Sequence, residues 1–510
     1  PTDMTDPAER IFWTDGRPAY APRPAPMPAR VDVAVVGAGF TGLAVAMHLA
    51  RAGRSVAVLE AQEIGHGASS RNGGLAGPSF HKIGMTGLTA RYGAGKAAAI
   101  MGEGMRALDH FEAFIADEGI DCGLRMTGRF RGAVTAADYE ATARECERLS
   151  KAVGLPFEMV PRARQRDEIG SDFYRGGVVY PRDGGLQPRL LLEALAARAE
   201  AAGALLFSGT PVVGIAHDGG DAVLRHPGGT LRARDVVIAT NAYGGAEGKT
   251  LASRVVPILT GAAATEPLPP ELMAELTPKG RAFTESRRVF MWFRPTPDGR
   301  RFIFGGRIGP MRGDPARRAA AVRASAMRVF PQLEDVAFTH LWTGRVAYTA
   351  DHAPHMGKID GVWVAGGYCG SGVTRSLWFA RNLALRIQGL PGGETAFDDL
   401  PFPPVPLRRL APLGALALTR RSGQHGGEAG GGGDPVDDAH RGAARRAARD
   451  VDHAAAAQHH RLHGVFARGG GDFVDHAGRR GVGVGFQRQN RHAAGAHPGQ
   501  LAGQPIGFDV

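Results

Sequence analysis

Cysteine is scarce in this chain of 510 residues, which contains Cys122, Cys146 and Cys369 and no CxxC pair. Structural zinc sites and disulfide frameworks need several closely spaced cysteines, so we expect neither, and we predict no metal site. So few cysteines also fit a reducing compartment, and we expect the protein to be cytoplasmic.

Long apolar runs are also missing. No stretch reaches the ~18–20 uninterrupted apolar residues that span a bilayer. The longest candidate, residues 31–50, is broken by three glycines and carries Asp32 and His48. The first ten residues contain acids and have no apolar core, unlike a signal peptide. We therefore expect no membrane partner.

Positive charge is in excess, because 61 Lys and Arg residues face 50 Asp and Glu residues, a formal net charge of +11. Such an excess can indicate a nucleic-acid partner. The basic residues do not cluster with aromatic residues as they do in a nucleic-acid-binding module. Arginines scattered over a surface, as a GC-rich coding sequence produces, explain the charge as well, and we expect no nucleic-acid partner.

Lysine, methionine, cysteine, tryptophan and tyrosine are all absent after Trp378. Residues 409–510 are mostly Gly, Ala, Arg, His, Asp and Val and have no sustained period. Because they have little apolar content to offset ordering entropy, we predict a disordered tail. The composition is typical of GC-rich DNA translated out of frame from about residue 409. A low-complexity or metal-binding region is the alternative.

Patterns of buried strands alternate with helical patterns in the first 390 residues. The sequence VDVAVVGAGF predicts a strand that runs into a glycine turn, followed by a helix over 41–52 and a second strand over 55–60. This βαβ start predicts a parallel sheet with a right-handed crossover. Similar pieces recur near 185–242 and 340–389, with other material between them, so the nucleotide-type domain is expected to be discontinuous.

The glycine turn contains the motif GxGxxG, formed by Gly37, Gly39 and Gly42. The first glycine permits the tight turn, the second lets the backbone approach a pyrophosphate, and the third lets helix and strand pack closely. The phosphates are then expected at the helix N-terminus. Glu60 ends the second strand, where an acid accepts hydrogen bonds from ribose hydroxyls and disfavours the 2′-phosphate of NADP. A plain exposed acid is the alternative for Glu60.

A second glycine-rich segment, GHGASSRNGG at 65–74, follows the second strand closely. Its small residues let the chain pass a flat ring, and its serines and arginine can contact phosphate or flavin edges. Together with the earlier motif, this segment resembles the D-amino-acid-oxidase-like flavoprotein superfamily, and most of all its bacterial branch of γ-glutamylputrescine oxidoreductase-type enzymes. Further similar stretches follow in the family's order, at 180–188, 237–243, 298–307, 342–354 and 366–372, so the resemblance covers about residues 11–408.

The resemblance implies an α/β fold in which a discontinuous, Rossmann-like FAD-binding domain carries an inserted, β-rich substrate domain. We predict a lead-in at 1–30, the FAD-binding domain at 31–90, 165–255 and 335–392, and the substrate domain at 91–164 and 256–334. The residues expected to bind FAD are Gly37, Gly39, Phe40, Thr41, Gly42, Glu60, Ala61, Gly67, Ala68, Ser69, Ser70, Arg71, Asn72, Gly73, Val213, Thr240, Asn241, Gly367, Gly370, Ser371, Gly372 and Val373. The residues expected to be catalytic are Arg71, Tyr348 and Thr374.

Different roles remain open for several of these residues. Tyr348 can be a core tyrosine, and Ser371 and Thr374 can cap the last helix. Trp342 and Trp378 are expected in the core rather than around the substrate. His66 is expected to be a loop residue facing solvent rather than a proton shuttle.

The chemistry implied by the resemblance is oxidative deamination of a small-molecule amine or amino acid, with a γ-glutamylputrescine-like substrate favoured. The flavin takes a hydride from the carbon that bears the amine, and water hydrolyses the imine. The alternatives are a glycine- or sarcosine-type oxidase or dehydrogenase, and a non-catalytic flavin-binding product of a damaged gene.

Two departures from the sarcosine oxidases of the same superfamily bear on the flavin and its oxidation. Val346 and Ala347 stand where those enzymes attach FAD through a cysteine, and we do not expect Cys369 to be attached either. Residues 291–310 also lack the lysine that helps oxygen react in those enzymes. The electron acceptor is therefore oxygen or another, unknown acceptor.

Overall fold

The structure is a computed structural model that describes residues 9–247, 249–287, 291–306 and 315–405. The elements below all belong to one compact unit within residues 1–427. The segment 409–510, for which the sequence predicts a disordered and out-of-frame tail, lies outside the described residues.

The first sheet has eight strands and contains the predicted βαβ start. Helix α1 (Phe40–Arg51) connects two neighbouring parallel strands, as the sequence predicts. The two central strands pair in register over four positions, from Val33 with Val56 to Val36 with Leu59. In spatial order the strands are β17 (His355–Ile359), β18 (Val362–Gly366), β11 (Gly229–Ile238), β1 (Arg30–Val36), β2 (Val56–Leu59) and β8 (Leu205–Phe207), with β10 (Asp221–His226) and β9 (Gly214–Asp218) continuing from β11.

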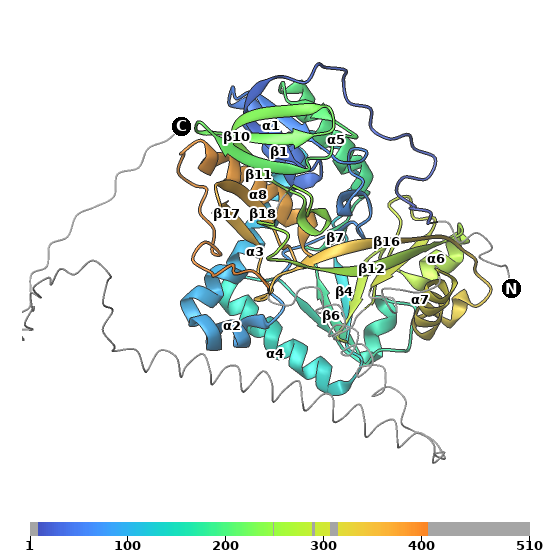
Figure 1. Ribbon diagram of the computed structural model, residues 1–510. Helices are drawn as coiled ribbons and strands as arrows, with labels where there is room; N and C mark the ends of the chain where they lie inside the picture. The colour runs from blue at the N-terminus through green and yellow to red at the C-terminus, as the bar shows by residue number, and fades with distance from the viewer. Residues whose placement is uncertain (1–8, 248, 288–290, 307–314, 406–510) are drawn as a thin grey trace, which may run out of the picture. The chain divides into compact units, whose positions relative to one another are not determined.

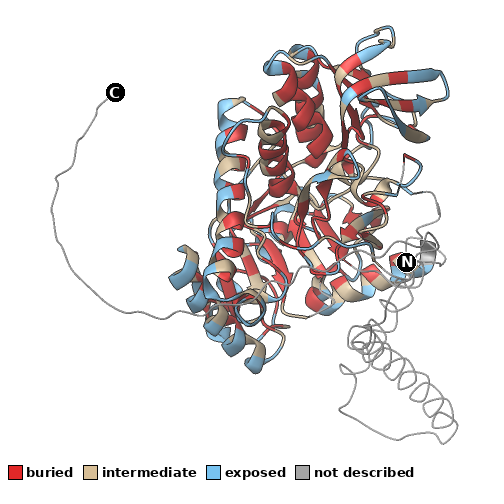
Figure 2. Cartoon of the chain, turned by 60° about the vertical axis from the view of Figure 1, so that its left-hand side comes forward, coloured by how far each residue is buried: buried red, intermediate tan, exposed pale blue. Residues whose placement is uncertain are grey.

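Both faces of the first sheet are covered. Val33 and Val35 of β1 pack on the face covered by α1, α3 (Ala94–Asp117), α5 (Pro188–Ala201) and α8 (Gly372–Ile387). The intervening Ala34 and Val36 pack on the opposite face with residues of β9, β10 and β11. Figure 2 shows that the helices beside this sheet are largely buried. Because each fully buried valine or leucine contributes about 1.5–3 kcal/mol, burial on two faces explains the unbroken apolar pattern of these strands.

The second sheet also has eight strands and has its own phenylalanine-rich core. Phe283, Phe293 and Phe302 stack on one another, with ring centres 5.2–6.2 Å apart. Helices α6 (Pro270–Leu276) and α7 (Pro315–Val329) pack over this core. In spatial order the strands are β16 (Phe338–Tyr348), β12 (Val256–Thr265), β15 (Phe302–Gly306), β14 (Met291–Pro295), β13 (Ala282–Glu285), β4 (Arg129–Gly132), β6 (Gly177–Tyr180) and β5 (Glu158–Val160).

A small third sheet, two further helices and a hairpin make up most of the remaining elements. Strands β3 (Leu75–Ala76) and β7 (Gly184–Gly185) form a two-stranded sheet, and helices α2 (Gly84–Tyr92) and α4 (Ala136–Val153) follow the first glycine-rich segments. Strands β14 and β15 form an antiparallel hairpin, with Gly299 in the left-handed region of φ (+70°) in its loop.

Strand pairing departs from the predicted domain limits at two strands. Strands β6 and β16 belong to the second sheet, although the sequence places both in stretches of the FAD-binding domain. Strand β16 pairs with β12 along almost its whole length, and its residues alternate between buried and partly exposed, which is typical of an antiparallel strand. The other domain limits remain a prediction.

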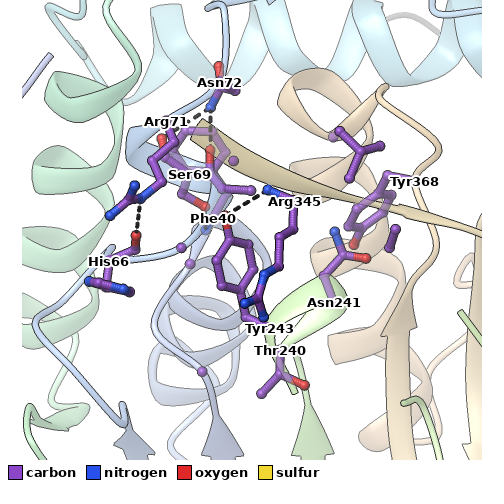
Figure 3. Close-up of a pocket in the computed structure, with 18 of the residues that line it drawn as sticks. Phe40, His66, Ser69, Arg71, Asn72, Thr240, Asn241, Tyr243, Arg345 and Tyr368 are labelled. Carbon is purple, nitrogen blue, oxygen red and sulfur yellow. Dashed lines mark hydrogen bonds between the residues drawn. The ribbon is translucent and has the colours of Figure 1, made fainter. Parts of the chain in front are cut away.

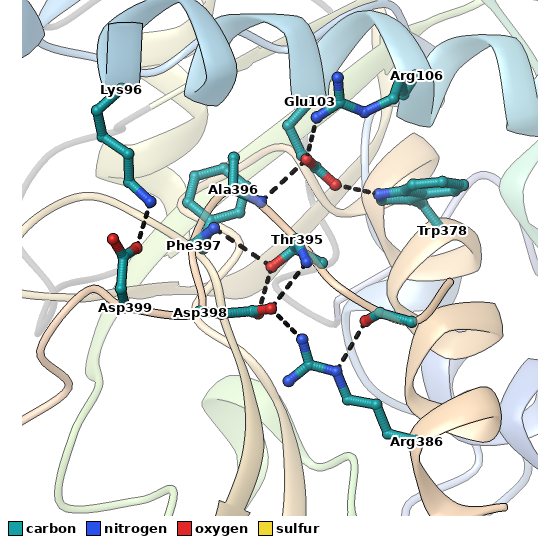
Figure 4. A network of polar contacts seen from close by, with 11 residues as sticks. Lys96, Glu103, Arg106, Trp378, Arg386, Thr395, Ala396, Phe397, Asp398 and Asp399 are labelled. Carbon is teal, nitrogen blue, oxygen red and sulfur yellow. Dashed lines mark hydrogen bonds and ion pairs between the residues drawn. The ribbon is translucent and has the colours of Figure 1, made fainter. Parts of the chain in front are cut away.

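The segment that follows α8 is fixed onto α3 (Figure 4). Glu103 on α3 is buried and accepts hydrogen bonds from the Trp378 indole at 2.5 Å and from the Ala396 amide at 3.1 Å. Lys96 on the same helix pairs with Asp399. These contacts hold residues 394–400 against the helices that cover the first sheet.

Two partly buried histidines on α1 and α3, His48 and His110, make the stability of this packing depend on pH. Burial lowers the pKa of His48 and of His110 to about 4, with the neighbouring histidine adding to the effect on His48 and Arg381 to that on His110. The unfolded chain therefore takes up protons between pH 6.5 and 4 that the folded chain does not, and the free energy of unfolding falls as the pH falls through this range.

We expect urea unfolding to give a free energy lower at pH 5 than at pH 7.5 by about 1–2 kcal/mol for each histidine. His110→Phe keeps a ring beside Trp378 and removes one titrating group, so it should reduce this loss by about 1–2 kcal/mol. His217→Phe, at an exposed position on β9, is the matched control. An unchanged pH dependence in His110→Phe would contradict the assignment.

Candidate active site

A cavity of about 760 Å³ lies at the carboxyl ends of the central strands of the first sheet. Ligands of open parallel sheets bind at this edge, where the loops that follow the strands converge. Its wall also contains residues of β12, β14, β15 and β16 from the second sheet. Most of its lining residues come from within the segments 36–41, 59–62, 65–73, 211–212, 239–247, 259–262, 342–348 and 368–376, although not every residue of these segments reaches the cavity, and Glu9, Lys82, Trp292 and Gly306 also line it.

The glycine loop is packed so closely that side chains have no room. A Cβ on Gly37, whose φ is +103°, would lie 3.2 Å from the backbone of Ala239 at the end of β11. A Cβ on Gly42 would lie 1.9 Å from the Gly37 carbonyl oxygen. Helix α1 can therefore approach the strand ends, and its N-terminus borders the cavity through Gly39, Phe40 and Thr41.

Glu60 borders the same end of the cavity, directly after β2. Its Oε2 accepts a hydrogen bond from the Ala38 amide at 2.8 Å, and its Oε1 accepts one from the Gln62 amide at 3.1 Å. Two backbone amides thus orient the carboxylate, and each of its oxygens keeps a lone pair for a further donor.

Arg71 and Asn72 are held by contacts from distant parts of the chain. The Trp342 indole donates to the Arg71 carbonyl at 2.9 Å, and the Trp13 indole donates to the Asn72 carbonyl at 2.8 Å. The Arg71 guanidinium donates to Glu9 at 2.9 Å, to the Thr343 carbonyl at 3.2 Å and to the His66 carbonyl at 2.9 Å. The backbone on this side of the cavity is therefore fixed in place.

On the opposite side of the cavity, side-chain contacts connect α1, the loop after β18 and the end of β11 (Figure 3). The Thr41 and Tyr368 hydroxyls lie 2.8 Å apart and link α1 to the loop after β18. The Asn241 side chain accepts a hydrogen bond from the Gly367 amide at 2.9 Å and links that loop to the end of β11. The guanidinium of Arg345 lies over the Tyr243 ring, 5.6 Å from its centre.

Comparison with known proteins assigns the chain to a family. The family model described as DAO, FAD dependent oxidoreductase, matches residues 32–386. The chain belongs to the DAO family of FAD-dependent oxidoreductases. FAD is therefore its cofactor, as the sequence predicts.

The relatives cover most of the chain and most of their own length. A probable oxidoreductase OrdL from Rhizobium meliloti is 32% identical over 390 residues, which are 73% of this chain and 90% of that protein. The γ-glutamylputrescine oxidoreductase of Escherichia coli is 31% identical over 74% of this chain and 88% of its own. The crystal structure of glycine oxidase from Geobacillus kaustophilus matches with a TM-score of 0.62 at 24% identity, over 74% of this chain and 99% of that one.

The described residues fit FAD. The N-terminus of α1 borders the cavity, and Gly39 has no side chain that would keep a pyrophosphate away from the backbone there. The Phe40 amide donates to Ser69 Oγ at 3.0 Å, so a hydroxyl of the 65–74 loop also lies at this end of the cavity. Glu60 has acceptor capacity left for ribose hydroxyls. The cavity continues from there past the loop at 65–73 to the second sheet, where a flavin ring would lie.

Most of the predicted site residues are brought together around this cavity. Its wall contains Gly37, Gly39, Phe40, Thr41, Glu60, Ala61, Gly67, Ala68, Ser69, Arg71, Asn72, Gly73, Thr240, Asn241, Tyr348, Gly370, Gly372 and Val373. Among the described lining residues, six predicted ones are missing: Gly42, Ser70, Val213, Gly367, Ser371 and Thr374. Gly42 and Gly367 still shape the wall through the close packing and hydrogen bond given above.

Two of these six predictions need correction. Val213 is 49% exposed and points away, whereas the preceding Val212 is buried and lines the cavity. Thr374 is 1% exposed, and its hydroxyl donates to the Gly77 carbonyl at 3.1 Å. Thr374 therefore braces the backbone after the 65–74 loop, and this placement does not support the catalytic role predicted for it.

The sequence leaves two alternative roles for each of three further residues, Ser371, Trp342 and His66, and the structure shows where each one lies. Ser371 is the N-cap residue of α8 but makes no capping hydrogen bond with its side chain among the described residues. Trp342 is buried and also lines the cavity, so it is both a core residue and part of the wall. His66 lines the cavity, and its carbonyl holds Arg71.

Sequence reasoning missed several lining residues. Glu9 and Lys82 border the cavity and belong to no local motif, and Tyr243 and Arg345 border it within family-like stretches in which no role was predicted for them. Only the fold brings these residues to the site.

The described residues add no other kind of site. Within 9–247, 249–287, 291–306 and 315–405, no group of three or more His, Cys, Asp or Glu side chains is arranged to hold a metal ion. In the same ranges, no helix has the length and apolar character needed to cross a membrane.

We expect Glu60→Gln to raise the dissociation constant of FAD roughly tenfold, because a carboxylate accepts stronger hydrogen bonds from hydroxyls than an amide does. Fluorescence titration of the apoprotein with FAD measures this. Glu63→Gln, at an exposed position three residues further on, should leave it unchanged. Equal FAD affinity in both variants would refute the ribose assignment.

Proposed function

We propose that this protein oxidises a carbon–nitrogen bond of a small amine or amino acid and passes the electrons to its FAD. The observation that carries this proposal is the single cavity that extends from the glycine loop to the second sheet. At one end it borders the glycine loop, where the dinucleotide would bind. At the other end it is lined by residues of β12, β14, β15 and β16 of the second sheet. Relatives named γ-glutamylputrescine oxidoreductase and glycine oxidase, together with a subunit of opine oxidase, support the class of substrate.

FAD supplies the acceptor for a hydride from the carbon that bears the nitrogen, and hydrolysis of the resulting imine releases the product. The chain's own residues then have to hold and shield the reactants. Trp292 lies against Gly73 and Gly305 so closely that a Cβ at either glycine would collide with its ring. Trp292 therefore closes the cavity at the second sheet and helps to exclude water.

The N-terminus of α8 supplies a favourable field. The loop formed by Tyr368, Cys369 and Gly370 leads from β18 into this helix and lines the cavity. The positive end of a helix dipole stabilises negative charge nearby, and reduction of a flavin places negative charge on its pyrimidine edge. Tyr348, at the end of β16, lines the cavity wall. We propose that it contacts the substrate.

Within this class we favour a γ-glutamylputrescine-like amine, because that relative is 31% identical over 74% of the chain. A glycine- or sarcosine-type substrate is the second candidate, supported by the similarity to glycine oxidase. We also propose the cytoplasm as its location, in keeping with three free, buried cysteines.

The test is anaerobic stopped-flow absorbance of the purified holoenzyme mixed with a panel of amines and amino acids. We expect one class of compound to bleach the visible flavin band, while its counterpart without the nitrogen leaves the band unchanged. Admission of oxygen to the reduced enzyme then separates an oxidase, which recovers its colour quickly, from a dehydrogenase. A bound flavin that no amine in the panel bleaches would argue against amine oxidation.

A further inference from the structure

Residues 9–23 form a strap that runs from the second sheet to a helix of the first. The match to the family model begins at residue 32, so the strap lies outside the part of the chain that this model defines. Between residues 9 and 23 the backbone forms a turn at 12–16 and neither a helix nor a strand. The position of the strap therefore depends on its contacts with the rest of the chain.

The first part of the strap is attached to the second sheet. The Arg10 amide donates to the Leu341 carbonyl on β16 at 3.0 Å. Trp13 is 1% exposed and packs in an apolar cluster with residues of β12, β15 and β16. The carboxylate of Asp15 lies 2.9 Å from Nε2 of the buried His340 on β16. This end is thus fixed to strands that border the cavity.

The second part of the strap is attached to α5, one of the helices that cover the first sheet. The Tyr20 hydroxyl donates to Glu200 Oε2 at 2.7 Å, and the Arg23 amide donates to Oε1 of the same carboxylate at 2.7 Å. The buried Arg189 of the same helix donates to the Pro18 carbonyl at 3.4 Å. The strap is therefore bound at both ends.

The strap also holds the loop at 65–74 through Trp13. The Trp13 indole donates to the Asn72 carbonyl at 2.8 Å. A trans peptide places its C=O and the next N–H on opposite sides, so a fixed Asn72 carbonyl also fixes the direction of the Gly73 amide. Gly73 lines the FAD cavity, whereas Trp13 is not among the described lining residues. Trp13 therefore acts on the cavity wall from behind.

Glu9 gives the strap a second contact with the same loop. Its carboxylate accepts hydrogen bonds from the Arg71 guanidinium at 2.9 Å and from the Thr343 hydroxyl on β16 at 2.7 Å. The consecutive loop residues Arg71 and Asn72 are thus both held by the strap.

The loop needs such contacts because its sequence is costly to order. Four of its ten residues are glycines, and its regular structure is a single short 3₁₀ turn at Ala68–Ser70. A contact that fixes the loop raises the fraction of molecules in which the site is ready to bind. By linkage, a ligand that binds the ordered loop must also stabilise the contact.

We propose that the strap retains FAD in the cavity, because Trp13 positions the flavin loop and bound FAD in turn holds the strap in place. Trp13 is a positioning residue, since it acts on the cavity only through the peptide between Asn72 and Gly73. The strap thereby belongs to the FAD site, although it precedes the first strand of the FAD-binding sheet. This inference rests on the cofactor and does not depend on the substrate.

The first experiment compares two tryptophan variants of the FAD-loaded protein. Trp13→Phe removes the indole donor and keeps an aromatic ring in the apolar cluster. Trp363→Phe on β18 is the matched control, because its indole donates to Asp235 at 2.9 Å and it is not among the described lining residues. The rate of FAD release after dilution is measured by the rise of free-flavin fluorescence, and the visible spectrum of the bound flavin is recorded.

We expect Trp13→Phe to release FAD roughly tenfold faster than the unaltered protein, because the buried Asn72 carbonyl loses its donor and the loop its order. The visible band of the flavin that is still bound should shift, since the Gly73 amide no longer has a fixed direction. Trp363→Phe should change neither the rate nor the spectrum, even where it lowers Tm.

The second experiment needs no variant. Hydrogen exchange is followed by mass spectrometry in the protein with and without FAD, over peptides from the strap and from the β9–β10 hairpin at 214–226. Removal of FAD should speed exchange in the strap about tenfold and should change the hairpin much less, because coupling between two sites is reciprocal.

Two outcomes would overturn the proposal. FAD release and a flavin spectrum in Trp13→Phe that match those of Trp363→Phe would remove the positioning role of Trp13. Strap exchange that is the same with and without FAD, or that rises equally in the hairpin, would remove the coupling between strap and cofactor. If Trp13→Phe does not fold, the exchange experiment on the unaltered protein decides.

Discussion

The architecture of the site depends on the close approach of the glycine loop to the end of β11. A Cβ on Gly42 would lie 1.9 Å from the Gly37 carbonyl oxygen, which no side chain tolerates, and Gly37 combines a φ of +103° with a tight 3.2 Å approach to the Ala239 backbone. This approach aligns the N-terminus of α1 with the carboxyl ends of β1, β2 and β11. A helix N-terminus stabilises anions only within its first turn. A side chain at either glycine would push the loop away from the strand ends and so displace the phosphate site.

The other half of the site is built by contacts between segments far apart in the sequence. The two indoles of Trp13 and Trp342 fix consecutive carbonyls of the loop at Arg71 and Asn72. Arg294 is buried and donates to the Gly74 carbonyl at 2.7 Å and to the Leu186 carbonyl at 2.9 Å. A glycine-rich loop has little stability of its own, and these buried donors supply the order that its sequence lacks.

The sequence was sufficient wherever a local steric rule decides the structure. A turn that needs positive φ, a helix that needs a small residue against a strand, and an acid at a strand end are all properties of a few neighbouring residues. Gly37, Gly42 and Glu60 were therefore identified correctly as elements of the first βαβ unit, and the family relationship followed from their order along the chain.

Placement across the two sheets could not be predicted in the same way. Val212 and Val213 have the same side chain, and only the path of the backbone in the folded protein decides which one faces the cavity. Thr374 lies within the first turn of α8, and its hydroxyl reaches the Gly77 backbone rather than the cavity. Lys82 and Glu9 come to the wall through pairings of distant strands, which depend on the whole fold rather than on the residues beside them.

Several charged side chains of the cavity wall are held in place by partners within the protein. Arg71, which the motif indicates as catalytic, is 13% exposed and is neutralised by Glu9, so its main effect on the wall is to hold it in place. Glu60 and Glu247 are likewise held by backbone amides, so these charged groups of the wall are oriented by the protein before any ligand binds.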